Sequence, residues 1–450
     1  MKKLIQTIRN IFSIEELKTR ILNTLLLLTV FRVGTFIRLP GIDKTVLDQM
    51  NQANPAKGLL DLINTFAGGA FERASIFALG IMPYISASIV VQLLTVAVPS
   101  FQKMSKEGED GRRKMNQITR YLTIAITAVQ AISFIINFQG TKGAAISPGV
   151  SSFMFMISSV IILVAGTMFT MWLGERITDR GLGNGISLII MVGIISMLPY
   201  SLLAEFSHKV NNNGGPIIFV IEIVIWLLVI LSVVLLVQGT RRIPVQYAKR
   251  IVGNKQYGGV RQYLPLKVNA AGVMPIIFAQ ALMFIPGSIS GFFPDSENWQ
   301  GFFSGFVDYT SFTYNAVFFV MIVLFTYFYT AITINPNQIA DDLKRNGGFI
   351  PGVKPGRATA NFVDSIMSRI TLPGAIFLGF VSIFPAFAII FGVNNQFAQF
   401  FGGTSLLIMV GVVLDTLQQI ESHLLMRHYD GLMKSGRIKG RSSTGGAISA

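Results

Sequence analysis

Ten apolar runs constrain this chain more than any other feature of its sequence. Crossing a bilayer as a helix takes about 20 predominantly apolar residues. The clearest run has no charged residue from Ala74 to Gln102. The ten runs lie near 21–37, 74–98, 121–139, 152–173, 186–204, 216–238, 270–290, 312–334, 372–393 and 404–420. Because the hydrocarbon core offers the backbone no hydrogen-bond partner, such runs form helices. The sequence predicts an all-α, polytopic membrane protein with ten transmembrane helices.

Composition excludes several classes of function. Only 13% of the 450 residues are charged, about half the share found in soluble domains. The chain has no cysteine, which excludes disulfides, thiolate metal sites and cysteine nucleophiles. The sequence also lacks a Walker phosphate loop, a His-Glu-x-x-His motif and a Gly-x-Ser-x-Gly elbow. We therefore expect no enzyme activity, no metal and no cofactor.

A short internal repeat indicates how the helices are arranged. Residues Gly80–Ile85 read Gly-Ile-Met-Pro-Tyr-Ile, and residues Gly272–Ile277 read Gly-Val-Met-Pro-Ile-Ile. The copies fall in the second and seventh apolar runs, so an odd number of crossings separates them and the two halves enter the membrane in opposite directions. Inverted repeats of this kind surround a site near the midplane. We predict two five-helix halves, 21–204 and 205–420.

The distribution of basic residues sets the orientation. The net charge is +15 with 37 lysines and arginines, and most of these lie in the N-terminal segment, the even-numbered loops and the tail 421–450. By the positive-inside rule both termini are cytoplasmic. The segment 1–20 opens on Lys2-Lys3 and then alternates apolar with polar residues. This pattern predicts an amphipathic helix on the surface of a membrane with anionic lipids.

Two cytoplasmic loops are longer than orientation alone requires. The loop 239–269 carries seven basic residues, no acidic residue and three interleaved tyrosines. Such uncompensated charge favours a docking surface for an acidic partner or RNA. Setting the membrane orientation is the alternative role. The loop 335–371 contains Gly347-Gly348, Pro351-Gly352 and Pro355-Gly356, which predict turns in a protruding finger.

The segment 58–67 is apolar but too short to cross the membrane. Segments of this length are commonly re-entrant, where protein or a cavity surrounds them. An amphipathic helix lying on the outer surface is the alternative. The glycines Gly68-Gly69 follow it as a hinge.

Few charges lie inside the apolar runs. They are Arg32, Glu222 and Asp415, and each maps toward a helix end, where an ion pair or nearby water is the favoured explanation. An ion-coupled transporter usually needs acidic residues at its centre. The centre is instead rich in isoleucine, with Ile81 and Ile85 one helical turn apart. Ordinary packing and the lining of a pore both remain open for these isoleucines.

Several long stretches of the chain match one known family. Residues 68–89 contain Gly-Gly-Ala-Phe-Glu-Arg-Ala-Ser-Ile-Phe-Ala-Leu-Gly-Ile-Met-Pro, and residues 401–408 read Phe-Gly-Gly-Thr-Ser-Leu-Leu-Ile. Further matches occur in family order at 166–175, 181–187, 247–250, 264–269 and 335–341. Together these stretches resemble the SecY family of bacterial protein-conducting channels, and the resemblance extends over nearly the whole chain.

The resemblance implies an hourglass pore between the two halves, with a lateral gate between the second and seventh spans. The constriction, which we call the isoleucine ring, falls on Ile81, Ile85, Ile190, Ile277 and Ile408, with Ile194 as a neighbour. The short segment falls on the family's plug, with apolar residues Leu59, Leu60, Leu62, Ile63 and Phe66. The basic loops fall on the surface that receives the SecA motor or the ribosome, at Arg241, Arg242, Lys249, Arg250, Lys344, Arg345, Lys354 and Arg357.

In the second basic loop, Lys354 stands where the family usually has arginine. Lysine keeps the charge but lacks the planar fork of arginine. The resemblance further implies SecE-like and SecG-like membrane subunits and an unfolded preprotein or signal peptide as substrate, with no direct binding of DNA. It places the chain in the bacterial cytoplasmic membrane. A small-molecule secondary transporter with the same inverted repeat is the alternative function.

Overall fold

The computed structural model describes residues 14–53, 64–142, 146, 151–212, 215–247, 250–252, 255–257, 261–290 and 310–434. Each of the ten predicted spans contains a helix, so the predicted helical fold is confirmed. The spanning helices are α2 (Glu15–Gly34), α5 (Met82–Ala97), α7 (Glu109–Lys142), α8 (Ser152–Arg180), α9 (Gly185–Asn212), α10 (Gly215–Gln238), α11 (Met274–Ser290), α13 (Phe312–Thr333), α15 (Arg357–Ile390) and α17 (Gly403–Lys434).

Length and apolarity alone identify fewer spans in the described part of the chain. Seven helices pass such a test individually, and the bent pair α5 and α6 (Pro99–Lys106) makes an eighth. Helix α2 has acidic residues in its first turn and Arg32 in its last, and α11 has only 17 residues. These two helices complete the ten predicted spans; α2 packs against α8 and α9, and α11 packs against α5 and α13.

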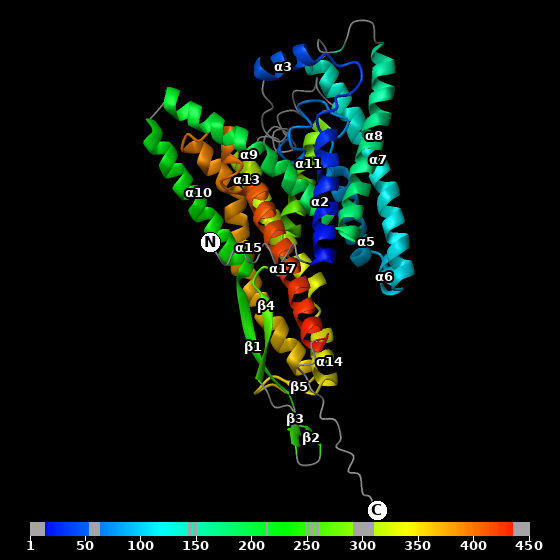
Figure 1. Cartoon of the computed structure of the whole chain (residues 1–450), viewed down its shortest axis with the longest axis vertical. Helices are drawn as coiled ribbons and strands as arrows, with labels where there is room; N and C mark the ends of the chain where they lie inside the picture. The colour runs from blue at the N-terminus through cyan, green and yellow to red at the C-terminus, as the bar shows by residue number, and fades with distance from the viewer. Residues whose placement is uncertain are drawn as a thin grey trace, which may run out of the picture.

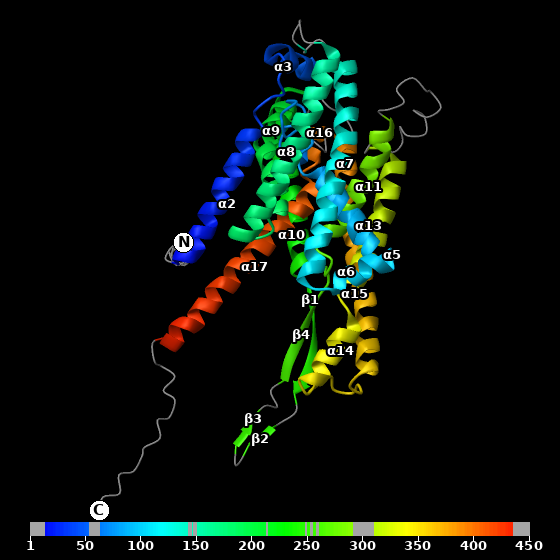
Figure 2. The same ribbon diagram turned by 90° about the vertical axis from the view of Figure 1, so that its right-hand side faces the viewer.

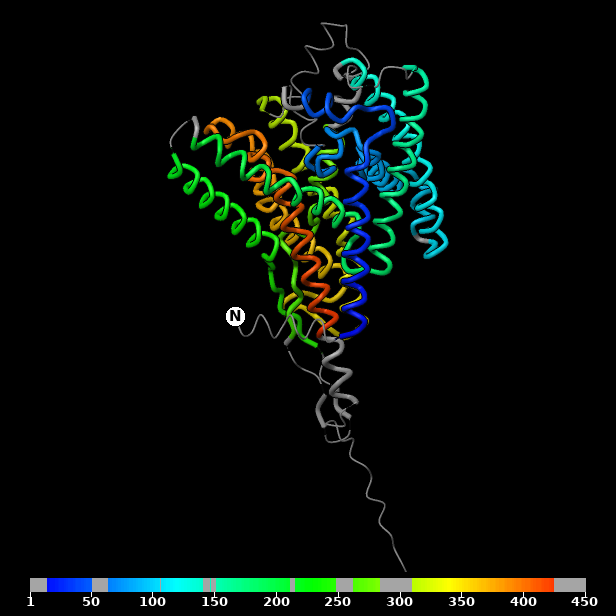
Figure 3. The backbone as a smooth tube through the Cα atoms, turned by 45° about the horizontal axis from the view of Figure 1, so that its top comes forward, coloured from blue at the N-terminus to red at the C-terminus, as the bar shows by residue number. Residues whose placement is uncertain are grey.

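The helices run between two differently built ends (Figures 1 and 3). A short amphipathic helix, α3 (Lys44–Ala53), lies at one end. The strands and helix α14 (Pro336–Arg345), which come from the two long loops with basic residues, lie at the other. In Figure 1, α2, α7 and α8 lie on one side of the bundle and α10 on the other.

The two copies of the repeat have the same local structure. Gly80 and Gly272 both adopt a left-handed conformation, with φ of 56° and 63°, which glycine adopts without steric cost. Helices α5 and α11 begin two residues later, each with proline in its first turn, where the missing N–H has no intrahelical partner to lose. The two helices then run in opposite directions (Figure 2).

The second predicted span is helical over only part of its length. Residues 67–81 form successive turns, and α5 starts at Met82. At its other end α5 meets α6 at an angle of 104°. Val98 is extended at this bend, before Pro99 starts α6. The apolar run is therefore a half-length helix preceded by an irregular segment packed inside the protein.

The long basic loop folds into a β-hairpin, an addition to the all-α core that the sequence analysis did not predict. Strand β1 (Thr240–Tyr247) pairs antiparallel with β4 (Arg261–Lys267). Strand β5 (Gly348–Phe349), from the second loop, pairs with the opposite edge of β1. Between β1 and β4, strands β2 (Arg250–Val252) and β3 (Lys255–Tyr257) form a separate pair. The two predicted cytoplasmic loops thus share one sheet, of order β4-β1-β5.

Several segments predicted as loop or tail are helical. Helix α14 occupies the start of 335–371, and α15 begins at Arg357 rather than after 371. Helix α17 continues to Lys434, beyond the predicted start of the tail at 421. A further short helix, α16 (Asn395–Ala398), precedes α17. Charged residues mark the ends of the apolar runs at these positions, but the helices continue through them.

Candidate functional site

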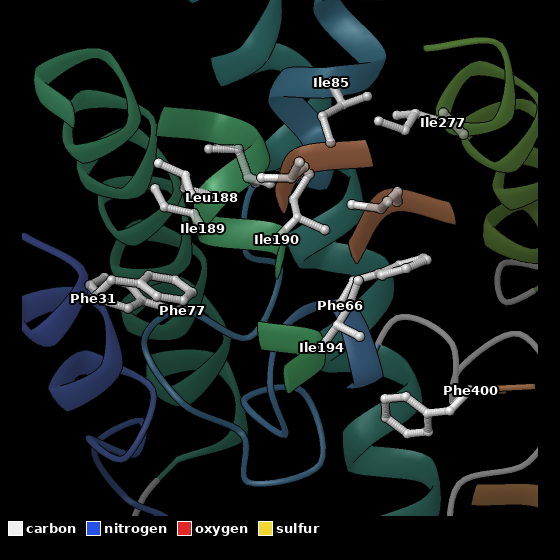
Figure 4. Packing of buried hydrophobic residues seen from close by; sticks show 14 of the residues in the cluster. Phe31, Phe66, Phe77, Ile85, Leu188, Ile189, Ile190, Ile194, Ile277 and Phe400 are labelled. Carbon is white, nitrogen blue, oxygen red and sulfur yellow. The ribbon is translucent and has the colours of Figure 1, made fainter. Parts of the chain in front are cut away.

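The six isoleucines of the ring come together in one buried cluster. They are contributed by the start of α5 and by α9, α11 and α17, and their exposed fractions range from 0% to 8%. Figure 4 shows Ile85, Ile190 and Ile277 converging from three different helices. Helical spacing explains the pairs, since residues four apart lie on one helix face. The structure therefore brings together side chains that lie as far apart in the sequence as Ile81 and Ile408.

The end of the predicted plug reaches this cluster. Of the five predicted plug residues, Leu59, Leu60, Leu62 and Ile63 lie outside the described residues. Phe66 is described, is 6% exposed and packs in the same cluster as the isoleucine ring. In Figure 4 it lies beside Ile194. The described end of the segment is thus inside the protein, which favours the re-entrant arrangement over a helix on the outer surface.

A glycine of α9 allows the segment to approach so closely. A Cβ built on Gly193 would lie 2.3 Å from the carbonyl oxygen of Phe66 and 3.2 Å from the nitrogen of Gly68. The backbone around Phe66 therefore rests directly on the helix, between Ile190 and Ile194. No other residue type fits this contact without displacing the backbone.

Polar contacts hold the residues on either side of Phe66, Asn64–Gly69, which we call the plug stem. The Thr65 hydroxyl donates to Gln399 Oε1 at 2.6 Å, and both residues are buried. Arg32 Nη1 donates to the Gly68 carbonyl at 2.8 Å. Because Gln399 belongs to the second half and Arg32 to the first, the stem is bonded to both halves.

Asn64 fixes the stem to the segment that follows it. Its side-chain nitrogen donates to Glu72 Oε2 at 3.0 Å, and its side-chain oxygen accepts from the Glu72 backbone N–H at 3.0 Å. This reciprocal pair closes a tight loop from Asn64 to Glu72, which sets the position from which Phe66 extends into the cluster.

Of the three charges predicted inside the spans, Glu222 is ion-paired, Asp415 is exposed, and Arg32 hydrogen-bonds a backbone carbonyl rather than a carboxylate. Glu222 forms an ion pair of 2.9 Å with Lys209, and Lys209 also lies 3.7 Å from Glu205. Lys209 Nζ donates to the Gly392 carbonyl at 2.8 Å, and Glu205 Oε2 accepts from the backbone N–H of Asn394 at 2.8 Å. Asp415, by contrast, is exposed on α17. Glu205, Lys209 and Glu222, which we call the ionic cluster, join the end of α9 to α10 and to the turn after α15.

The predicted docking residues lie on the cytoplasmic sheet and its neighbours. Arg241 and Arg242 are exposed on β1, while Ile243 and Val245 face a small core shared with α14 and α15. Lys344, Arg345, Lys354 and Arg357 are all exposed around the end of α14 and the following turn. Lys249 and the side chain of Arg250 lie outside the described residues. We call the six described side chains and their sheet the basic platform.

The sequence analysis did not identify polar residues whose bonding partners come from other parts of the chain. Gln399 and Lys209 lie outside any apolar run and carry no motif, and their partners are 334 and 13 residues away in the chain. Gly193 did leave a signal, because it is a glycine between two ring isoleucines in an otherwise strongly apolar helix. A glycine in that position usually marks a close backbone approach.

Comparison with known families gives one match over most of the chain. The family model of SecY matches residues 75–417. The curated protein translocase subunit SecY of Halalkalibacterium halodurans is 45% identical over 436 residues, covering 95% of this chain and 100% of that protein.

Solved structures share the fold at lower identity. A structure of a protein conducting channel superimposes with a TM-score of 0.65 and 18% identity, covering 94% of this chain and 95% of that one. A chain of Sec61 from the canine ribosome–channel complex of the endoplasmic reticulum has a TM-score of 0.62 and 17% identity, with the same coverage of 94% and 95%. At these identities the likeness establishes the architecture.

Proposed function

This chain belongs to the SecY family, and on that premise we propose that it is a protein-conducting channel of the membrane. It passes unfolded secretory polypeptides across the bilayer and releases transmembrane segments sideways into the lipid. The isoleucine ring carries the proposal. Six aliphatic side chains, from α9, α11, α17 and the start of α5, lie in one buried cluster that also contains Phe66.

The chemistry of the ring suits an indiscriminate polypeptide substrate. A passing chain presents every kind of side chain, so a constriction built from fixed hydrogen-bonding groups would retain some sequences. Aliphatic side chains offer no such bonds, and an apolar constriction excludes water when it is empty. We infer that the ring acts as a compliant seal around the polypeptide. Val273, which matches Ile81 in the repeat, is also apolar.

We propose roles for the segments around the ring: the plug stem closes the pore, and helices α5 and α11 form the lateral gate. Phe66 and the plug stem occupy the outer side of the ring in the resting channel, and movement of the stem opens the path. Helices α5 and α11 are in contact. Each begins at a left-handed glycine and a first-turn proline, so neither helix continues on the other side of the ring. We propose that separation of these two half-length helices opens the pore to lipid.

The energy for transport comes from partners, because the sequence offers no phosphate-binding loop for ATP. We propose that SecA or a translating ribosome docks on the basic platform and drives the polypeptide. A related channel, canine Sec61, has been solved in a complex with the ribosome. SecE-like and SecG-like subunits complete the assembly in the bacterial cytoplasmic membrane. Both termini lie in the cytoplasm, as the charge distribution indicates.

Reconstitution tests the function. Proteoliposomes containing this chain and its membrane subunits are supplied with SecA, ATP and a radiolabelled preprotein, and protease is then added outside. We expect protease-protected preprotein only when SecA and ATP are both present. Liposomes carrying an unrelated ten-span transporter are the control. Saturable uptake of a small solute by this chain alone, without protected preprotein, would instead support a secondary transporter, and ATP hydrolysis without SecA would contradict a passive pore.

A further inference from the structure

A small cavity lined by polar and apolar side chains lies among helices of the second half. Its volume is about 30 Å³. Helices α11, α13, α15 and α17 surround it, together with the turn that precedes α17. The lining includes Gln280, Tyr314, Ser382, Gln399, Thr404 and Ser405. This many polar groups is unusual at a depth where the surrounding helices are otherwise apolar.

One polar atom of this lining has no protein partner. Ser405 is 1% exposed, and its hydroxyl makes no hydrogen bond with any residue that the structure describes. Ser405 also stands in the first turn of α17, where backbone N–H groups have no intrahelical acceptor. Leaving a buried hydroxyl unpaired is unfavourable. The usual solution in native proteins is a bound water molecule.

A second pair in the cavity is bonded only weakly. The Gln280 side-chain nitrogen donates to the Tyr314 hydroxyl at 3.4 Å, which is at the long end for a hydrogen bond. Both residues are buried, at 4% and 3% exposure. Both residues line the same cavity as Ser405.

The cavity has the size and chemistry of a water site. A buried water needs about 10–15 Å³ of space and two to four polar partners, whereas dry cavities are lined by apolar side chains. We propose that this cavity binds one ordered water molecule, which bridges Ser405 on α17 to Gln280 and Tyr314 on α11 and α13. The water belongs to the folded channel rather than to its transport path.

The site adjoins the hydrogen bond that holds the plug stem. Gln399 lines the cavity and also accepts the hydroxyl hydrogen of Thr65 at 2.6 Å. Gln280, on the opposite wall, belongs to α11. The water therefore completes a polar connection from the plug stem to a helix of the gate. This consequence, unlike the water site itself, rests on the proposed channel function.

Radiolytic footprinting of the assembled channel tests the site directly. Hydroxyl radicals formed from an ordered water mark the side chains beside it even when these are inaccessible to bulk solvent. We expect oxidation of Tyr314 despite its burial. Phe155, which is 1% exposed in an apolar cluster, serves as a dry control. Tyr263, 59% exposed on β4 outside the spans, is the positive control.

Two substitutions of Ser405 test whether the oxidation of Tyr314 depends on the water site. Ser405→Val fills the space with methyl groups and should reduce the oxidation of Tyr314 at least fivefold. Ser405→Ala removes the hydroxyl without filling the cavity. It provides a second variant to measure if the larger valine variant fails to fold. If Tyr314 is no more oxidised than Phe155 in the unaltered channel, the water site is wrong.

Ion leakage through the resting channel tests separately whether the water is coupled to the plug. With the water displaced by Ser405→Val, we expect a severalfold increase in ion leakage through the resting channel in a planar bilayer. Unchanged leakage together with lost oxidation would overturn the coupling but keep the water site. Failure of the unaltered channel to conduct any preprotein would count against the proposed function and leave the footprinting result standing.

Discussion

The isoleucine ring and the ionic cluster are both buried, yet they are built on opposite principles. The ring consists of aliphatic side chains that interact with any apolar neighbour. The ionic cluster holds Lys209 between two carboxylates, with a carbonyl at 2.8 Å and an ion pair at 2.9 Å. Dispersion and burial have no preferred direction, whereas buried charges require particular partners at particular distances. The proposed seal is apolar, whereas the junction of α9 with α10 and with the turn after α15 is fixed by charge.

The largest expected effect comes from breaking the ionic cluster. Lys209→Met leaves Glu205 and Glu222 buried without their cation, and losing one partner of a buried ion pair typically costs about 3–5 kcal/mol. We expect thermal unfolding of the purified channel at a markedly lower temperature. Lys103→Met, at an exposed position on α6, is the matched control. Equal unfolding temperatures for the two variants would contradict the role assigned to the cluster.

A polar side chain in the isoleucine ring should damage the seal rather than the fold. Ile85→Asn buries an amide without a partner, at about 1–3 kcal/mol, and this penalty favours a wet, open constriction. We predict roughly tenfold more ion leakage through the resting channel, since about 1.4 kcal/mol corresponds to that factor. Ile85→Leu conserves volume and should leave the leakage unchanged. A leak as large in the leucine variant would show that the ring depends on a specific shape.

Substituting the repeat glycines tests whether backbone conformation places the helices that carry the ring. Alanine at Gly80 or Gly272 would meet no atom closer than 3.8 Å. The expected cost is therefore the left-handed conformation alone, about 1–2 kcal/mol in each case. Gly140→Ala in α7, which also meets no neighbour within 4 Å, should instead stabilise by about 1 kcal/mol. Unfolding in denaturant measures all three, and unequal effects at Gly80 and Gly272 would break the symmetry of the repeat.

Reversing exposed charges should have the smallest effect on stability. It should selectively weaken binding of SecA or the ribosome. Arg241→Glu with Arg242→Glu reverses two exposed charges on β1, each worth up to about 1 kcal/mol in a surface contact. We predict roughly tenfold weaker SecA or ribosome binding, with a reduced dependence on salt and unchanged unfolding. Lys44→Glu, exposed on α3 at the opposite end, is the control. Unchanged affinity would leave membrane orientation as the only role of these arginines.

The sequence predicted those features that depend on local patterns. Ten apolar runs indicated ten helices, and the repeat at Gly80 and Gly272 indicated two halves with matching helix starts. The isoleucines were singled out by their spacing, and the family resemblance assigned them to a ring. Their convergence in one buried cluster is a property of the folded chain.

Features that depend on contacts across the fold escaped prediction. The sheet joining both cytoplasmic loops is formed by β1 and a two-residue strand, Gly348–Phe349, which is too short to leave a periodic signal. Gln399 and Lys209 acquire their roles only from residues brought to them by other helices. Gly193 marks a close backbone approach in the sequence, but that the plug stem is the approaching segment is seen only in the fold.

Site-specific crosslinking tests the central claim most directly, since the chain contains no cysteine. One cysteine is placed at Ile85 or Ile408, and another in a preprotein stalled during transport with SecA. We predict a disulfide at both ring positions and none at Leu228, which is 59% exposed on α10. Absence of the ring crosslink, in channels that are folded and carry the stalled preprotein, would contradict the account. The isoleucine ring would then be ordinary packing.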